Sequence, residues 1–154
     1  MLTLQTLEKI KNGAKITLFN GIFAVLYGIL YLVFLNPIIK SNFRVVDVVW
    51  QVFYKYNHEM GAIFVRAIVL KGIFIIALGL AIIYLSSQIL KRKEKITWVM
   101  LFVIGLIFWP ALLTIEILDK NIFTIIAASI GWIAFIIGMV IPLRYYMQRE
   151  YTEY

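Results

Sequence analysis

The stretch RAIVLKGIFIIALG, residues 66–79, decides the class of this protein, because it combines a long apolar run with two basic side chains. The run extends over about residues 62–86, which exceeds the roughly 20 mostly apolar residues that a transmembrane helix needs. A cation within such a span is costly unless it reaches the headgroups or is paired. The sequence therefore predicts a membrane span in which Arg66 and Lys71 each need a headgroup or a specific partner.

Three further segments have the length and composition of a membrane span. They cover about residues 16–35, 96–118 and 122–143, with Asn36-Pro37 after the first and Arg144 after the last. Lipid offers no hydrogen-bond partner for backbone N–H and C=O groups. We therefore expect these spans to be helices, which satisfy both groups internally. We predict an all-α integral membrane protein, with four transmembrane helices in one bundle and residues 1–154 as a single domain.

The composition agrees with a membrane protein and excludes several functions. The chain of 154 residues is 63% hydrophobic and 15% charged, whereas about 25% charged residues are usual in soluble domains. The formal charge of +7 comes from basic residues that lie between apolar runs, so nucleic acid is not a predicted partner. There is no cysteine, which excludes disulfides, thiolate nucleophiles and thiolate-bound metals.

The distribution of basic residues predicts the orientation of the chain. Cytoplasmic flanks of membrane proteins are enriched in Lys and Arg. The N-terminal segment, the second loop and the C-terminal tail together hold nine such residues: Lys9, Lys11, Lys15, Lys91, Arg92, Lys93, Lys95, Arg144 and Arg149. The first and third loops hold four: Lys40, Arg44, Lys55 and Lys120. We therefore expect both termini and the second loop in the cytoplasm.

Two segments outside the spans have the pattern of amphipathic helices. Leu4, Leu7 and Ile10 recur every third position, which predicts a short helix on the inner leaflet at the N-terminus. In the first external loop, SNFRVVDVVWQVFYKYNHEMG (residues 41–61), polar side chains recur at intervals of three and four. They are Arg44, Asp47, Gln51 and Lys55.

This loop pattern predicts an interfacial helix in the outer leaflet. Its inward side consists of the apolar residues Phe43, Val46, Val49, Trp50 and Phe53. Two interpretations of the helix are open. It either packs over the end of the bundle, or it forms a lid over something held below.

Glycine spacing indicates how the spans pack. Three spans carry two glycines seven residues apart: Gly21 and Gly28, Gly72 and Gly79, and Gly131 and Gly138. Seven residues are two helical turns, so each pair lies on one face and allows close approach of a neighbouring backbone. We expect these faces to be helix–helix contacts.

The predicted orientation brings several charges to the outer half of the bundle. The second span begins outside and the third ends there, so Arg66, Lys71, Glu116 and Asp119 share one depth. Glu59 and His58 lie at the entrance of the second span. These six residues are the candidate ligand-binding site, with Glu116 as the best partner for Lys71.

The sequence favours a purely structural role for these charges over this binding site. Arg66 can reach a phosphate by snorkelling, and Glu116 and Lys120 are four residues apart, as in a local ion pair. In the functional interpretation, Arg66 and Lys71 bind an anionic headgroup or a carboxylate. They are five residues apart, about 140° around a helix, so they do not both face one narrow pocket.

Catalysis has little support in the sequence. His58 is the single histidine, so no metal site or cofactor is predicted. We rank first a non-catalytic binding or accessory subunit, in contact with the lipid bilayer and with other membrane subunits, a homo-oligomer partner, or a lipid-like or quinone-like ligand. Second is a small carrier or channel for an amphipathic anion. Third is a membrane enzyme acting on lipid-like substrates.

Overall fold

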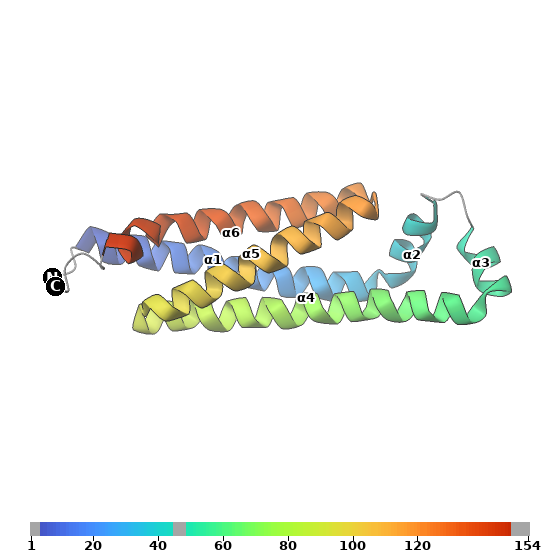
Figure 1. Cartoon of the computed structure of the whole chain (residues 1–154), viewed down its shortest axis with the longest axis horizontal. Helices are drawn as coiled ribbons and strands as arrows, with labels where there is room; N and C mark the ends of the chain where they lie inside the picture. Colours follow the sequence, from blue (N-terminus) through green and yellow to red (C-terminus); the bar gives the residue numbers. More distant parts are fainter. Residues whose placement is uncertain (1–3, 45–48, 149–154) are drawn as a thin grey trace.

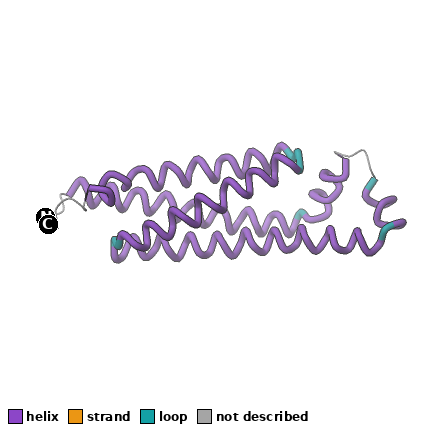
Figure 2. The backbone as a smooth tube through the Cα atoms, viewed as in Figure 1, coloured by secondary structure: helices purple, strands orange, loops and turns teal. Residues whose placement is uncertain are grey.

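The computed structural model describes residues 4–44 and 49–148, and these form six helices. They are α1 (Leu4–Val33), α2 (Leu35–Arg44), α3 (Trp50–Tyr56), α4 (His58–Arg92), α5 (Lys95–Leu118) and α6 (Ile122–Gln148) (Figure 1). The described ranges contain no strand (Figure 2). Four helices, α1, α4, α5 and α6, are long and apolar enough to cross a membrane, which confirms the predicted all-α class and the four spans.

The four long helices form a bundle in which chain neighbours are also neighbours in space. Helix α1 packs against α4 and α6, and α5 packs against α4 and α6 while crossing them obliquely (Figure 1). The start of α1, the end of α6 and the α4–α5 connection share one end of the bundle, here called the terminal end. Helices α2 and α3 and the α5–α6 connection lie toward the opposite end, here called the loop end.

Side-chain exposure fits a bundle surrounded by lipid. The bundle core holds large side chains that are fully buried, among them Trp109, Phe135 and Ile75. Each long helix also exposes large apolar side chains, such as Leu80 at 54% and Ile107 at 67%. Such a surface would be unfavourable in water and is ordinary against lipid chains.

Glycines set the close contact between α1 and α4. A Cβ atom on Gly79 would lie 2.8 Å from the backbone nitrogen of Val25 and 3.0 Å from the carbonyl oxygen of Gly21. A Cβ atom on Gly28 would lie 3.0 Å from the carbonyl oxygen of Gly72. The predicted use of these two pairs as helix contacts is therefore confirmed.

The third glycine pair divides its contacts between two neighbouring helices. Gly138 faces Thr17 of α1, and Gly131 faces the indole ring of Trp109 in α5. Both are close contacts in which an added Cβ would collide, so the prediction of tight packing holds here as well. The glycines of α6 thus connect it to both of its neighbours.

Helix α1 differs from its predicted bounds at both ends. It runs without interruption from Leu4, and Ile10 is buried, so the expected short N-terminal helix is the first part of α1 rather than a separate element. At the other end α1 stops at Val33, and α2 begins at Leu35 and includes Pro37. The proline ring clashes with the carbonyl four residues earlier, which is that of Val33, so the break falls before Asn36.

The first loop contains two short helices instead of the single amphipathic helix that its pattern predicts. Val49 has φ −79° and ψ 119°, an extended conformation that separates α3 from the preceding chain. Helical periodicity does not apply to Val49, and its side chain is 59% exposed rather than turned inward. Gln51 and Lys55 are exposed. Val46 and Asp47 lie outside the described residues.

An aromatic cluster holds α2 and α3 against the start of α4. The ring of Phe43 lies 4.8 Å from that of Trp50, 4.9 Å from Phe53 and 5.0 Å from Phe64 of α4. Phe43, Trp50 and Phe53 therefore pack together at the start of α4. Tyr54 packs directly on Gly61, where no Cβ would fit.

Helix α4 is longer than a membrane is thick. Its 35 residues span about 52 Å, whereas a bilayer with its headgroup regions measures about 40–45 Å. The helices α2 and α3 pack on its first turns, at the loop end (Figure 1). This part of the molecule therefore extends beyond the four-helix core.

Candidate functional site

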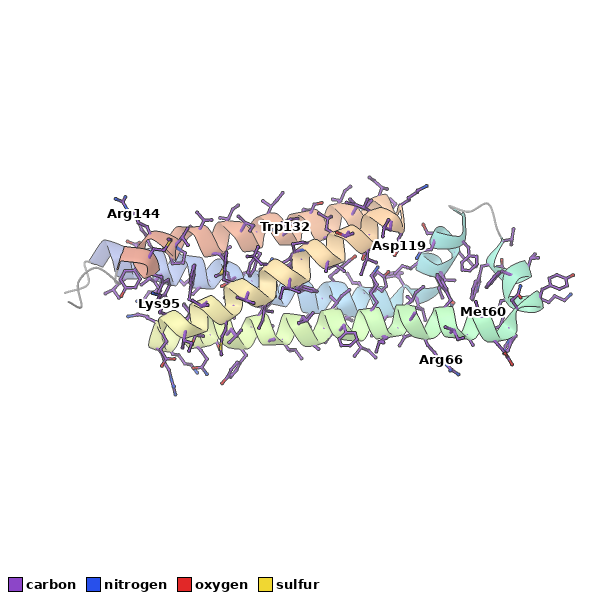
Figure 3. The ribbon with its side chains drawn as sticks, viewed as in Figure 1. Met60, Arg66, Lys95, Asp119, Trp132 and Arg144 are labelled. Atoms are coloured by element: carbon purple, nitrogen blue, oxygen red, sulfur yellow. The ribbon has the colours of Figure 1, made fainter. Side chains whose placement is uncertain are left out.

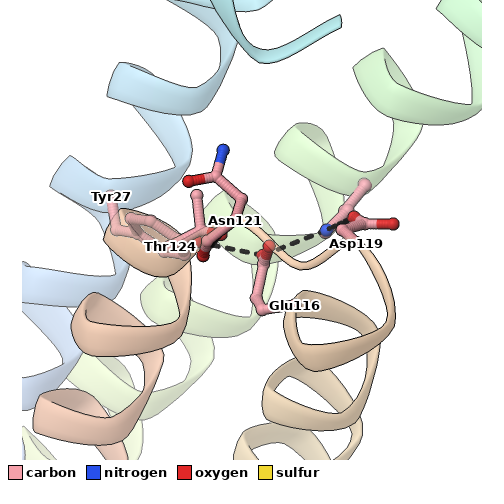
Figure 4. Close-up of polar contacts among 6 residues, drawn as sticks. Tyr27, Glu116, Asp119, Asn121 and Thr124 are labelled. Atoms are coloured by element: carbon pink, nitrogen blue, oxygen red, sulfur yellow. Dashed lines mark hydrogen bonds and ion pairs between the residues drawn. The ribbon is translucent and has the colours of Figure 1, made fainter. Parts of the chain in front are cut away.

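A lysine inside the bundle is held by two carboxylates. The Lys71 Nζ atom of α4 lies 3.0 Å from Oε1 of Glu116 and 3.1 Å from Oδ2 of Asp119 (Figure 4). Glu116 belongs to the last turn of α5, and Asp119 caps that helix. The contact between Lys71 and Glu116 is the pairing predicted from their shared depth, and Asp119 provides a second partner.

Two tyrosines of α1 complete the contacts of these charged groups. The Tyr27 hydroxyl donates a hydrogen bond to Oε1 of Glu116 at 3.0 Å. The Lys71 ammonium lies 4.8 Å from the centre of the Tyr31 ring, within range of a cation–π interaction. Thr124 of α6 is buried beside Tyr27 (Figure 4) and donates to the Asn121 carbonyl at 3.0 Å.

The charge cluster, defined here as Lys71, Glu116 and Asp119, is buried on one side and open on the other. The Glu116 side chain is 1% exposed, that of Lys71 15% and that of Asp119 30%. Glu116 therefore forms the closed end, among side chains of the bundle. Asp119 forms the end that is exposed to the surroundings.

One atom of the cluster lacks a partner. Both partners of the Glu116 carboxylate, Lys71 and Tyr27, contact its Oε1 atom. The other oxygen, Oε2, is buried, and no donor of the described residues bonds to it. Most buried polar atoms in proteins are hydrogen-bonded, and an orphaned acceptor carries the cost of its lost hydration. This oxygen therefore distinguishes the cluster from a fully satisfied structural ion pair.

The other three predicted site residues lie elsewhere. Arg66 is exposed on α4 and points away from the bundle (Figure 3), about 7.5 Å along the helix from Lys71. Glu59 and His58 are exposed at the start of α4, where the His58 ring contacts Tyr54 at 4.6 Å between ring centres. The structure thus brings together three of the six predicted residues. Glu116 pairs with Lys71 rather than with Lys120.

A second group of polar residues lies deeper in the bundle and is fully used in joining helices. Asn20 of α1 donates from Nδ2 to the Gly131 carbonyl of α6 at 2.6 Å and accepts from the Trp109 indole N–H of α5 at 3.1 Å. Ser86 of α4 donates to the Thr17 hydroxyl of α1 at 2.9 Å. Since each of these groups has its partner in the bundle, they act as structural hydrogen bonds.

The arrangement is better suited to holding charge than to covalent chemistry. Within residues 4–44 and 49–148 there is no group of three His, Cys, Asp or Glu side chains that could hold a metal ion. The cluster contains an ammonium, two carboxylates and tyrosine hydroxyls, and the ammonium is already in contact with both acids. The cluster therefore holds helices together by electrostatic attraction, and one carboxylate oxygen of Glu116 has no donor among the described residues.

These features define a multi-pass α-helical membrane protein with a buried charge cluster at one end of its bundle. Comparison with models of protein families, with curated proteins and with solved structures finds no match. The class of protein follows from the four apolar helices alone.

Proposed function

We propose that this chain is a small non-catalytic membrane protein that acts as an accessory subunit of a larger membrane complex. The observation that carries the proposal is that the charged side chains inside the bundle are engaged in contacts between its helices. Glu116 of α5 contacts both Lys71 of α4 and Tyr27 of α1 and so joins the three helices. A carrier for an amphipathic anion needs a cation free to bind it, and Lys71 already faces two carboxylates.

The part of the chain beyond the core supports a protein partner. Val49, Val52 and Tyr56 of the α3 segment are 59%, 52% and 77% exposed, while Trp50 and Phe53 are used in the aromatic cluster. Helix α3 packs on the first turns of α4, beyond the four-helix core (Figure 1), and in this proposal a protein partner covers its exposed apolar side. Exposed apolar surface of this kind is typical of protein contacts.

Purification of the full chain from its native membrane in a mild detergent tests this function. We expect a protein partner in a fixed ratio, identified by native mass spectrometry. Val52→Lys should weaken that association about tenfold or more, since it places a charge in the apolar contact. Gln51→Lys, an exposed neighbour of the same helix, is the matched control and should leave the association unchanged.

The other outcomes of this purification contradict the accessory role. A tightly retained lipid-like or quinone-like molecule without a protein partner would show a ligand-binding protein instead. A chain that carries neither, or a partner retained equally by both variants, would remove the support that α3 gives to the proposal.

Orientation is part of the same proposal. In the described residues, Lys9, Lys11, Lys15, Lys91, Arg92, Lys93, Lys95 and Arg144 belong to segments at the terminal end. Excess Lys and Arg mark the cytoplasmic side. A reporter fused after Tyr154 should therefore be cytoplasmic, and one inserted near Ser41 should be external. The reverse pattern of reporter activity would place the charge cluster at the inner face.

A further inference from the structure

We propose that the connection between α4 and α5, residues 91–95, binds the headgroup of an acidic phospholipid whose acyl chains lie along the exposed apolar sides of these two helices. The ligand is defined by an anionic phosphate headgroup that is joined to hydrocarbon chains. This inference depends neither on the accessory role nor on the orientation of the chain, because it follows from the charges and the exposed surfaces at the terminal end of the bundle.

The connection is the most basic stretch of the chain. Its five residues, KRKEK, hold four basic side chains and one acidic side chain. Lys91 and Arg92 are exposed in the last turn of α4. The acid, Glu94, lies 3.8 Å from Arg92 and accepts a hydrogen bond from the Thr97 hydroxyl at 3.3 Å. One acid offsets only one of the four positive charges, and basic clusters beside a membrane span attract anionic headgroups.

Lys91 continues the lipid-facing side of α4. The exposed residues Ala77, Tyr84 and Lys91 are each seven residues apart, so they follow one another along one face of the helix. Ile82 and Ile89 precede Tyr84 and Lys91 by two residues and are buried at 0% and 2% exposure, which places the core on the other side. The Lys91 ammonium therefore lies about 10 Å along the helix from Tyr84, where the apolar surface of α4 gives way to charge.

Helix α5 presents a second apolar surface directly after the connection. Ile96, Val99 and Met100 are 65%, 41% and 53% exposed. Their spacing of three and four residues places them on one side of the helix. A phospholipid matches the basic connection and this apolar surface together, whereas a soluble phosphate matches the charges alone.

Contacts with α6 hold the connection in place. The Tyr146 hydroxyl of α6 donates a hydrogen bond to the Lys93 carbonyl at 3.5 Å, and the Tyr146 ring stacks on that of Trp98 at 5.1 Å between ring centres. Lys93 caps α4 with φ 56° and ψ 27°, and its N–H group bonds to the Ile89 carbonyl at 3.0 Å. The backbone that carries the basic side chains is therefore ordered before a lipid binds, which lowers the entropic cost of binding.

Lipid titrations of the full chain in detergent, followed by native mass spectrometry, test the proposal. We expect phosphatidylglycerol to bind about tenfold or more tightly than phosphatidylcholine with the same acyl chains, since each nearby cation favours the anionic headgroup. Lys91→Gln combined with Arg92→Gln should remove this preference and leave the affinity for phosphatidylcholine unchanged. Lys40→Gln combined with Lys55→Gln removes the same charge from exposed sites at the loop end, and this control should bind as the wild type does.

Two comparisons define the ligand and its location. Glycerol phosphate lacks acyl chains and should not displace phosphatidylglycerol at equal concentration, so effective competition would overturn the assignment of a lipid. Lys9→Gln combined with Lys11→Gln changes exposed residues of α1 at the same end, and a loss equal to that of the connection variant would show a diffuse attraction instead of this site. The proposal is also overturned if the wild type binds both lipids equally, a measurement that needs no variant, or if the connection variant keeps the wild-type preference.

Discussion

Replacing Lys71 with methionine is expected to lower the free energy of unfolding by about 3–5 kcal/mol, the usual cost of removing one partner from a buried ion pair. The ammonium lies 3.0 Å from Glu116 and 3.1 Å from Asp119, and the Glu116 side chain is 1% exposed. Without the lysine, Glu116 remains buried with only the Tyr27 hydroxyl as a donor. Thermal or chemical unfolding in detergent measures the loss.

The double variant shows whether this loss belongs to the pair. Lys71→Met combined with Glu116→Gln should cost much less than the sum of the single changes, because the remaining carboxylate of Asp119 is partly exposed. Strictly additive single effects would contradict a direct interaction. A neutral or stabilising Lys71→Met would instead indicate a lysine that reaches the headgroups, since methionine suits lipid better than an ammonium does.

Arg66→Met provides the matched control on the same helix. Arg66 carries the same charge as Lys71 but is exposed on α4 and points away from the bundle (Figure 3). Its replacement should change stability by no more than about 0.5 kcal/mol, as is usual for surface sites. Equal losses for Arg66→Met and Lys71→Met would mean that burial does not determine the effect.

The four spans and the Lys71–Glu116 contact could be predicted from sequence because both depend on how deep a residue lies in the membrane, which follows from its position along the helix. Apolar length identifies a span without knowledge of its neighbours. Residues at matching depths of consecutive antiparallel helices lie close together if they face inward, and the cost of a lone charge in lipid favours that direction. The same reasoning places Arg66 at a similar depth, but its side chain lies about 140° around the helix from Lys71 and meets the surroundings of the bundle.

The remaining parts of the site depend on the rotation of each helix about its own axis and on contacts between residues far apart in the chain. No short stretch of sequence indicates either of these. Tyr31 lies one turn beyond Tyr27 and faces the same cluster, yet in sequence it is one aromatic among many in an apolar run. Thr114, a polar residue in the apolar run of α5, is exposed, and its hydroxyl bonds to the Pro110 carbonyl of its own helix. The one sequence feature that indicates a shared role for Tyr27 and Tyr31 is their spacing of four residues, which places them on one face of the helix.

The first loop shows how a break in the backbone defeats a periodic pattern. The apolar and polar residues of this loop recur as in one amphipathic helix, and Phe43, Trp50 and Phe53 pack together. The predicted pattern fails at Val49, because the extended backbone before α3 resets the direction of the side chain. Aromatic packing against Phe64, a long-range contact, decides which side of each short helix is buried.

Replacing Gly79 with valine is expected to have an effect as large as the loss of Lys71, because the α1–α4 contact leaves no room for a side chain. The first atom of that side chain would lie 2.8 Å from the Val25 backbone nitrogen and 3.0 Å from the Gly21 carbonyl oxygen. Backbone atoms cannot move aside as a flexible side chain does, so the two helices must separate. We expect a loss of about 3 kcal/mol or more, at or above the upper end for overpacked sites.

Two comparisons make this prediction specific to the backbone contact. Ala77→Val lies two residues away on the exposed side of α4, and it should change stability by no more than about 0.5 kcal/mol.

Gly72→Ala first meets the end of the Leu32 side chain at 2.6 Å, while the Gly28 carbonyl lies 3.6 Å away. Leu32 can change rotamer, and alanine gains about 1 kcal/mol of helix propensity over glycine, so this change should be close to neutral. Gly79→Ala has the same propensity gain but meets backbone, and it should destabilise the fold. If Gly72→Ala and Gly79→Ala have equal effects on Tm, contact between backbones is not what holds α1 against α4.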